Sequence, residues 1–140
     1  MEKCAICGCT LHREGEYAQP TIRGRSHATA HHFVPERFFG RSKNRPNEQR
    51  EAILSESDLA EFEHDFGILC YECHEELLHN PVLLREDIEL FSSLATAKGY
   101  AEEEKEQTRK NIAGRIELLH QVIRAGLKVF AEEAKPCQPE

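Results

Sequence analysis

Two cysteine pairs with the same spacing constrain this chain more than any other feature of its sequence. Two residues separate Cys4 from Cys7, and two residues separate Cys70 from Cys73 much further along the chain. Two thiolates at this spacing can bind one ion from a single tight turn, and two such turns complete a tetrahedral zinc site. We therefore predict a structural Zn²⁺ bound by Cys4, Cys7, Cys70 and Cys73. This ion would clamp together the two ends of a long insert and stabilise the folded chain.

Two alternatives to zinc binding exist for the six cysteines, and each explains fewer features of the sequence. Residues 70–74 also fit the Cys-x-x-Cys-His pattern of covalent haem attachment, and the cysteines could instead form disulfides. Both need an oxidising compartment, whereas the first residues have no apolar stretch typical of a secretory signal. We therefore expect a cytoplasmic protein with reduced thiols. Cys9 could replace Cys7 as a ligand, although the spacing favours Cys7, and Cys137 lies in the tail.

Length and charge limit the kinds of partner. The chain has 140 residues, enough for one domain with an appendage, and no apolar run long enough to span a membrane. Its net charge is −7, but residues 1–50 carry nine Lys/Arg against five Asp/Glu, a net of +4, and residues 51–140 carry nine against twenty, a net of −11. We expect the basic half to face a phosphate backbone. The expected contacts are Arg37, Arg41, Lys43 and Arg45, in an exposed loop over residues 36–50.

The pattern of apolar residues predicts short strands followed by helices. We expect strands at residues 31–34 and 66–69, with a short acidic helix between them within residues 51–64. A helix over 72–78 should end before Pro81, and a helix over 84–98 should end at Gly99. These elements predict an α+β fold: a zinc-stapled core over residues 1–80, a helical extension over 81–135 and a flexible tail over 136–140.

A long helix is predicted over residues 102–134. Its apolar residues recur at helical spacing, which is typical of a face packed into a core. They are Ile112, Ile116, Leu119, Ile123 and Phe130. The alternative is that this stripe forms the seam of a homodimer, which would pair two copies of the site across a duplex.

Histidines form two clusters, one within the insert and one just after it. His31 and His32 are adjacent in the first predicted strand, so their side chains point to opposite sides of it. His74 directly follows a predicted zinc ligand, and His79 comes five residues later. Hydrolysis of a phosphodiester needs a metal ion on the phosphate and a separate base for water, which two such histidines can supply. The alternative is that His31 and His32, beside Phe33, are ordinary surface or core histidines.

These motifs together resemble the HNH endonucleases, also called ββα-metal or His-Me finger nucleases. The matching residues are His31-His32-x-x-Pro35 and then Asp65-Phe66-x-x-Leu69-Cys70-x-x-Cys73-His74, preceded by the Cys4 and Cys7 pair. The resemblance spans residues 4–79. It implies a ββα-metal core that hydrolyses DNA phosphodiester bonds, with double-stranded DNA as the expected partner. Residues 80–140 have no counterpart in the minimal family motif.

The resemblance also implies a role for each matching residue. His31 and His74 fall on ligands of a catalytic divalent ion such as Mg²⁺, Mn²⁺ or Ni²⁺, and His32 falls on the general base. Asp65 replaces the central Asn of the family and would order the loop or bind the ion. His79 is an additional candidate ligand, although a spacing of four places two residues on one helical face better than five. The alternative function is a non-catalytic zinc module that binds nucleic acid or protein, which Asp65 and the acidic C-terminal half favour.

Overall fold

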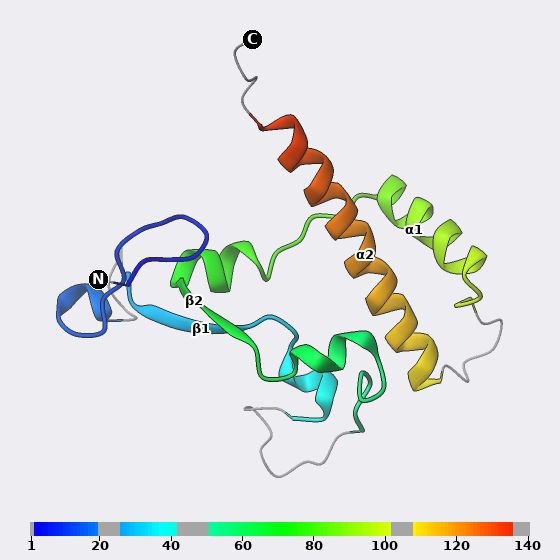
Figure 1. The fold of residues 1–140 in the computed structure, drawn as a ribbon, viewed down its shortest axis with the longest axis horizontal. Coiled ribbons are helices and arrows are strands. Elements are labelled where there is room, and N and C mark those ends of the chain that lie inside the picture. Colours follow the sequence, from blue (N-terminus) through cyan, green and yellow to red (C-terminus); the bar gives the residue numbers. More distant parts are fainter. Residues whose placement is uncertain (1, 20–25, 42–50, 102–107, 136–140) are drawn as a thin grey trace.

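The fold is a two-stranded antiparallel sheet followed by helices, seen in a computed structural model that describes residues 2–19, 26–41, 51–101 and 108–135 (Figure 1). The strands are β1 (Ala28–His32) and β2 (Phe66–Cys70), and a short helix, η4 (Glu72–Leu77), follows β2 directly. Two longer helices complete the chain, α1 (Arg85–Ala97) and α2 (Arg109–Glu133). None of the described helices is long and apolar enough to cross a membrane.

The two strands pair as a long-looped hairpin. Their pairing brings together the two ends of residues 33–65, the part of the insert that lies between the strands. His31 pairs with Gly67, and Ala28 pairs with Cys70. The prediction of a strand at residues 31–34 is wrong in its bounds. Strand β1 begins three residues earlier than predicted and ends at His32. The Phe33 amide still donates to the Asp65 carbonyl, but Pro35 has no amide to continue the ladder. The two adjacent histidines therefore lie at the very end of the strand.

The N-terminal segment folds back on itself beside the sheet. The Cys4 amide donates to the Cys9 carbonyl at 2.9 Å, and the Gly8 amide donates to the Cys4 carbonyl at 3.0 Å. Gly8 has a φ of 77°, a conformation that favours glycine. The tight turn between the two cysteines packs against β2 and η4 in one buried cluster. This cluster contains Cys4, Leu11, Leu69, Cys70 and Cys73.

The insert forms a second core with α2. It contains two short 3-10 helices, η2 (Glu36–Phe39) and η3 (Asp58–Phe62), and η3 is the short acidic helix predicted within residues 51–64. The buried residues of this core are Val34, Leu54, Leu59 and Ala113. Ala113 comes from the first half of α2, which therefore covers the insert that the hairpin closes (Figure 1).

The two long helices lie side by side and are joined through residues 98–108 (Figure 1). Helix α1 ends as predicted, since Gly99 has a φ of 81° directly after it. The Thr108 hydroxyl caps α2 by accepting from the Asn111 amide at 3.1 Å. The part of the predicted long helix over residues 102–107 lies outside the described residues.

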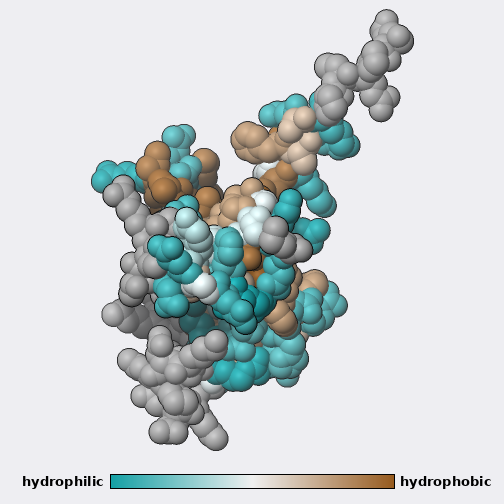
Figure 2. Space-filling view, turned by 90° about the vertical axis from the view of Figure 1, so that its left-hand side faces the viewer, coloured by the Kyte–Doolittle hydropathy of each residue, from teal (hydrophilic) through white to brown (hydrophobic). Residues whose placement is uncertain are grey.

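The apolar stripe of α2 is only partly buried, which corrects the prediction that it packs into the core. Ile112, Ile116 and Leu119 are half-buried, whereas Ile123 is 51% exposed and Phe130 is 72% exposed. The described part of the insert reaches only the first half of the helix. Figure 2 accordingly shows apolar side chains at the surface beside the C-terminal end of α2.

Candidate functional site

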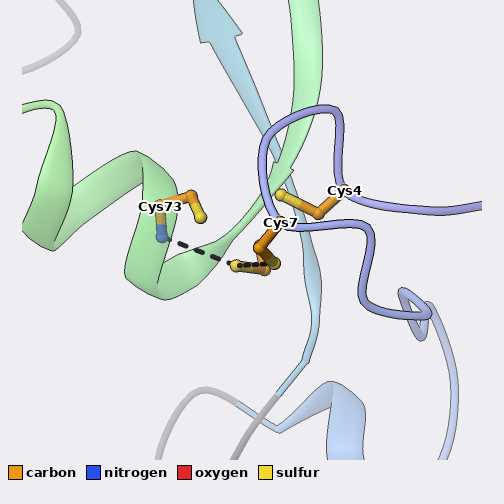
Figure 3. A group of neighbouring side chains, drawn as sticks. Cys4, Cys7 and Cys73 are labelled. Atoms are coloured by element: carbon orange, nitrogen blue, oxygen red, sulfur yellow. Dashed lines mark hydrogen bonds between the residues drawn. The ribbon is translucent and has the colours of Figure 1, made fainter. Parts of the chain in front are cut away.

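Four cysteine sulfurs from two distant parts of the chain meet beside the sheet. The Sγ atoms of Cys4, Cys7, Cys70 and Cys73 all lie within 4.8 Å of one another. Figure 3 shows Cys4 and Cys7 on the N-terminal turn, facing Cys73 on η4. Cys7 Sγ and Cys70 Sγ are 3.8 Å apart. A tetrahedral zinc ion binds each sulfur at about 2.3 Å, which places two of its sulfur ligands about 3.8 Å apart. The four cysteines could therefore hold one zinc ion.

Backbone amides support the thiolate form of some of these cysteines. Burial raises the pKa of Cys4, but hydrogen bonds from the backbone of Cys70, Cys7 and Ile6 outweigh it and lower that pKa to about 6. The Cys73 amide donates to Cys70 Sγ at 3.5 Å. Burial and the neighbouring thiols raise the pKa of Cys73 to about 12. A cation bound here would therefore displace a proton from Cys73.

Cys9, the alternative ligand, lies beside this group and not within it. The group of sulfurs within 4.8 Å includes Cys7 and leaves Cys9 out. Burial, with hydrogen bonds to Cys7 and Cys70, raises the pKa of Cys9 to about 12. Cys9 is half-buried against the cluster, where it packs as a protonated thiol.

Three histidines converge next to the cysteine group. His31 comes from β1, His74 from η4, and His79 lies just after η4; one ring nitrogen of each lies within 4.8 Å of the other two. The His31 and His74 ring centroids are 5.0 Å apart, and those of His74 and His79 are 5.3 Å apart. Burial, followed by the charges of His74 and His79, lowers the pKa of His31. The lowered pKa favours the neutral ring, which is the form that binds a metal.

The π-helical form of η4 is what brings His79 to this group. The Leu78 amide donates to the Cys73 carbonyl, five residues before it, at 3.1 Å. This hydrogen bond defines a π turn, which carries more residues per turn than an α-helix. Two residues five apart therefore lie on one face here. The five-residue spacing between His74 and His79 would separate their side chains on an α-helix, whereas a π turn places them on the same face.

The Thr29 hydroxyl orients the ring of His74. The Thr29 hydroxyl donates to the Leu69 carbonyl at 2.7 Å, so its oxygen is left to accept from His74 Nδ1, 2.9 Å away. This contact places a proton on Nδ1 of His74, and the Glu75 carboxylate lies 3.5 Å from the same nitrogen. A second partner of this kind, which orients a histidine from behind, is typical of metal sites.

His32 lies at the end of β1 next to His31, and strand alternation turns it to the opposite face. Its Nε2 is 3.3 Å from the Glu36 carboxylate, and its ring centroid is 6.0 Å from that of Phe66. Glu36 begins η2 immediately after Pro35. The Glu36 carboxylate therefore lies within ion-pair distance of one nitrogen of the ring.

No protein-family model, curated protein or solved structure matches this chain. What the site can do is therefore inferred from its own geometry.

Among the described residues, the predicted site residues Asp65, Arg37 and Arg41 do not join the histidine group. The Asp65 side chain is exposed, and it is outside the set of ligand atoms that lie within 4.8 Å. Arg41 donates to the Glu63 carboxylate, and the Arg37 guanidinium lies 5.0 Å from the Phe38 ring centroid. Lys43 and Arg45, also predicted to contact DNA, lie outside the described residues.

Two residues of the site were missed in the sequence. Thr29 lies two residues before His31, so both point to the same face of β1, and Glu36 follows His32 by four residues. These spacings are a weak signal by themselves. The contact of Thr29 with His74 and that of Glu36 with His32 are seen only in the folded structure.

Proposed function

We propose that this chain is a metal-dependent endonuclease of the HNH type, with a ββα-metal core built from β1, β2 and η4. The observation that carries the proposal is the convergence of His31, His74 and His79 within 4.8 Å, beside a cysteine group suited to zinc. Three imidazoles at this separation suit a divalent transition metal, which binds them in their neutral form. The substrate proposed is the phosphodiester backbone of DNA.

The chain's own residues would bind and orient the reactants. His31, His74 and His79 would hold the divalent ion, with Thr29 fixing the ring of His74. Such an ion would neutralise the phosphate and stabilise the departing 3′ oxygen. The zinc held by the four cysteines would have no part in the chemistry, since its task is to keep η4 against the hairpin.

His32 would act as the general base. Nδ1 of its ring would take a proton from the attacking water, while Glu36 holds Nε2 and stabilises the positive ring that results. A histidine base operates near neutral pH because its ordinary pKa is about 6.5. Because the side chains of His31 and His32 alternate across the end of the strand, the phosphate would have to lie over that end to reach both.

The first prediction concerns this base. His32→Ala should lower the rate of plasmid nicking by at least about 100-fold, because general-base catalysis typically contributes that much. Nicking would be measured on supercoiled DNA with Mg²⁺, Mn²⁺ or Ni²⁺, alongside the zinc content and the circular dichroism spectrum.

His64→Ala is the matched control, since His64 is exposed in the insert and outside the histidine group. It should cut like the wild type. Wild-type protein that never cuts DNA with any of the three metals would refute the enzyme.

A second candidate function is a non-catalytic zinc module that binds another protein. The exposed apolar residues on α1 and on the second half of α2 favour it. This module would bind one metal ion per chain, whereas the endonuclease would bind two. Metal analysis before and after mild chelation separates them, because an ion held by histidines is removed before one held by four thiolates.

A further inference from the structure

A cavity of about 430 Å³ lies between the segment after β1 and the second half of the insert, with α2 as its third wall. This volume is in the range of small-ligand sites, roughly 300–1,000 Å³. Most of its lining is apolar and aromatic. The lining residues are Phe33, Val34, Pro35, Phe38, Leu59 and Phe62, with Ile116, His120 and Arg124 from α2.

Phe33 connects this cavity to the proposed catalytic site. It directly follows His32, and its ring centroid is 6.3 Å from that of His31. The ring lies over Gly67, where a Cβ would approach Phe33 to 3.1 Å. Phe33 is nevertheless 58% exposed, so one part of its ring is available to a ligand. A strand bound at His31 could therefore place its next base against this ring.

The polar side chains of the cavity are basic. His120 and Arg124 lie one turn apart on α2, and both line the cavity. Arg124 is exposed and forms no ion pair within the part of the chain that the structure describes. Three acidic residues, Asp58, Glu61 and Glu117, line an adjoining cavity that shares His120 and Arg124, and none of the three lines this one. An apolar cavity with an unpaired guanidinium at one side suits a flat ring attached to a phosphate.

We propose that this cavity receives one unpaired nucleobase of the substrate strand, next to the phosphate that is cut. The base stacks on Phe33, and Arg124 contacts the adjoining phosphate. This inference rests on the proposed endonuclease function and names its substrate class, a strand with at least one unpaired nucleotide. A base already free of pairing enters such a cavity at the lowest cost.

The test measures binding, so that it is independent of cleavage. A fluorescent single-stranded DNA of eight nucleotides and its duplex are titrated with wild-type protein. A chelator prevents cleavage, at a concentration that leaves the zinc in place. Wild type should bind the single strand more tightly than the duplex. Phe33→Ala should weaken single-strand binding by roughly tenfold, since one stacked base typically contributes that much, and Arg124→Gln should weaken it and reduce its salt dependence.

Lys128→Gln is the matched control, because Lys128 is exposed on α2 and does not line the cavity. It should bind like the wild type. Equal binding by Phe33→Ala and wild type, or tighter binding of the duplex by both, would overturn the nucleobase site. Loss of cutting in His32→Ala would still support the endonuclease in that case, so the two failures can be told apart.

Discussion

At the residue scale, the hydroxyl of Thr29 carries the most specific prediction. Thr29→Val keeps the shape and removes the nearer of two acceptors beside His74 Nδ1, the other being the Glu75 carboxylate at 3.5 Å. It should weaken binding of the second metal ion by roughly 10- to 100-fold. Thr29→Ser restores the hydroxyl and should bind like the wild type. Isothermal titration of zinc-loaded protein with Mn²⁺ or Ni²⁺ measures this affinity. Equal affinity for the valine and serine variants would mean that Thr29 does not orient His74.

At the element scale, substitutions at two glycines of α2 distinguish the effect of packing on stability from the effect of helix propensity. A Cβ on Gly114 would lie 2.3 Å from Cε1 of Tyr100, so Gly114→Ala must displace the ring that joins the two long helices. Overpacking of this kind costs about 1–3 kcal/mol, more than the roughly 1 kcal/mol that alanine gains over glycine in a helix. Gly114→Ala should therefore lower the free energy of unfolding in urea.

Gly126→Ala is the matched change on the same helix, with nothing within 4 Å of the added Cβ. It should raise the free energy of unfolding by up to about 1 kcal/mol. If both variants shift stability in the same direction, Tyr100 does not pack on Gly114 in solution.

At the scale of the whole molecule, the cysteine group holds segments far apart in the chain together. Cys70→Ser should abolish zinc binding and expose the hairpin to proteolysis, because the core on this side is made largely of the cysteines themselves. Cys9→Ser should keep one zinc per chain, since Cys9 lies outside the group. Metal analysis and limited proteolysis measure both. A Cys9→Ser protein without zinc would reassign the ligands.

The exposed half of the α2 stripe leads to a prediction about assembly. We propose that Ile123, Leu127 and Phe130, which continue at helical spacing from the buried part of α2, pair with the same face of a second copy. Leu127→Glu combined with Phe130→Glu should convert a dimer to a monomer in analytical ultracentrifugation. Lys128→Glu, an exposed change on the same helix, should leave the dimer intact. A monomeric wild type would exclude this assembly.

Some features of the site follow from local spacing. The two cysteine pairs select their own turns, because two thiolates separated by two residues reach one ion without help from the rest of the chain. Gly99 ends α1 for an equally local reason, since its φ of 81° suits glycine. Both features depend on a few neighbouring residues, so the amino-acid sequence alone could predict them.

Other features depend on contacts between residues far apart in the chain. The π turn that brings His79 beside His74 exists only where η4 packs on the hairpin, and a spacing rule for α-helices argues against it. Thr29 reaches His74 only through the register of β1 with β2. The stripe of α2 looks continuous in the sequence, but the described insert covers only its first half. The sequence by itself determined which residues can bind metal, whereas the tertiary structure decided which of them meet, because burial and long-range pairing set those positions.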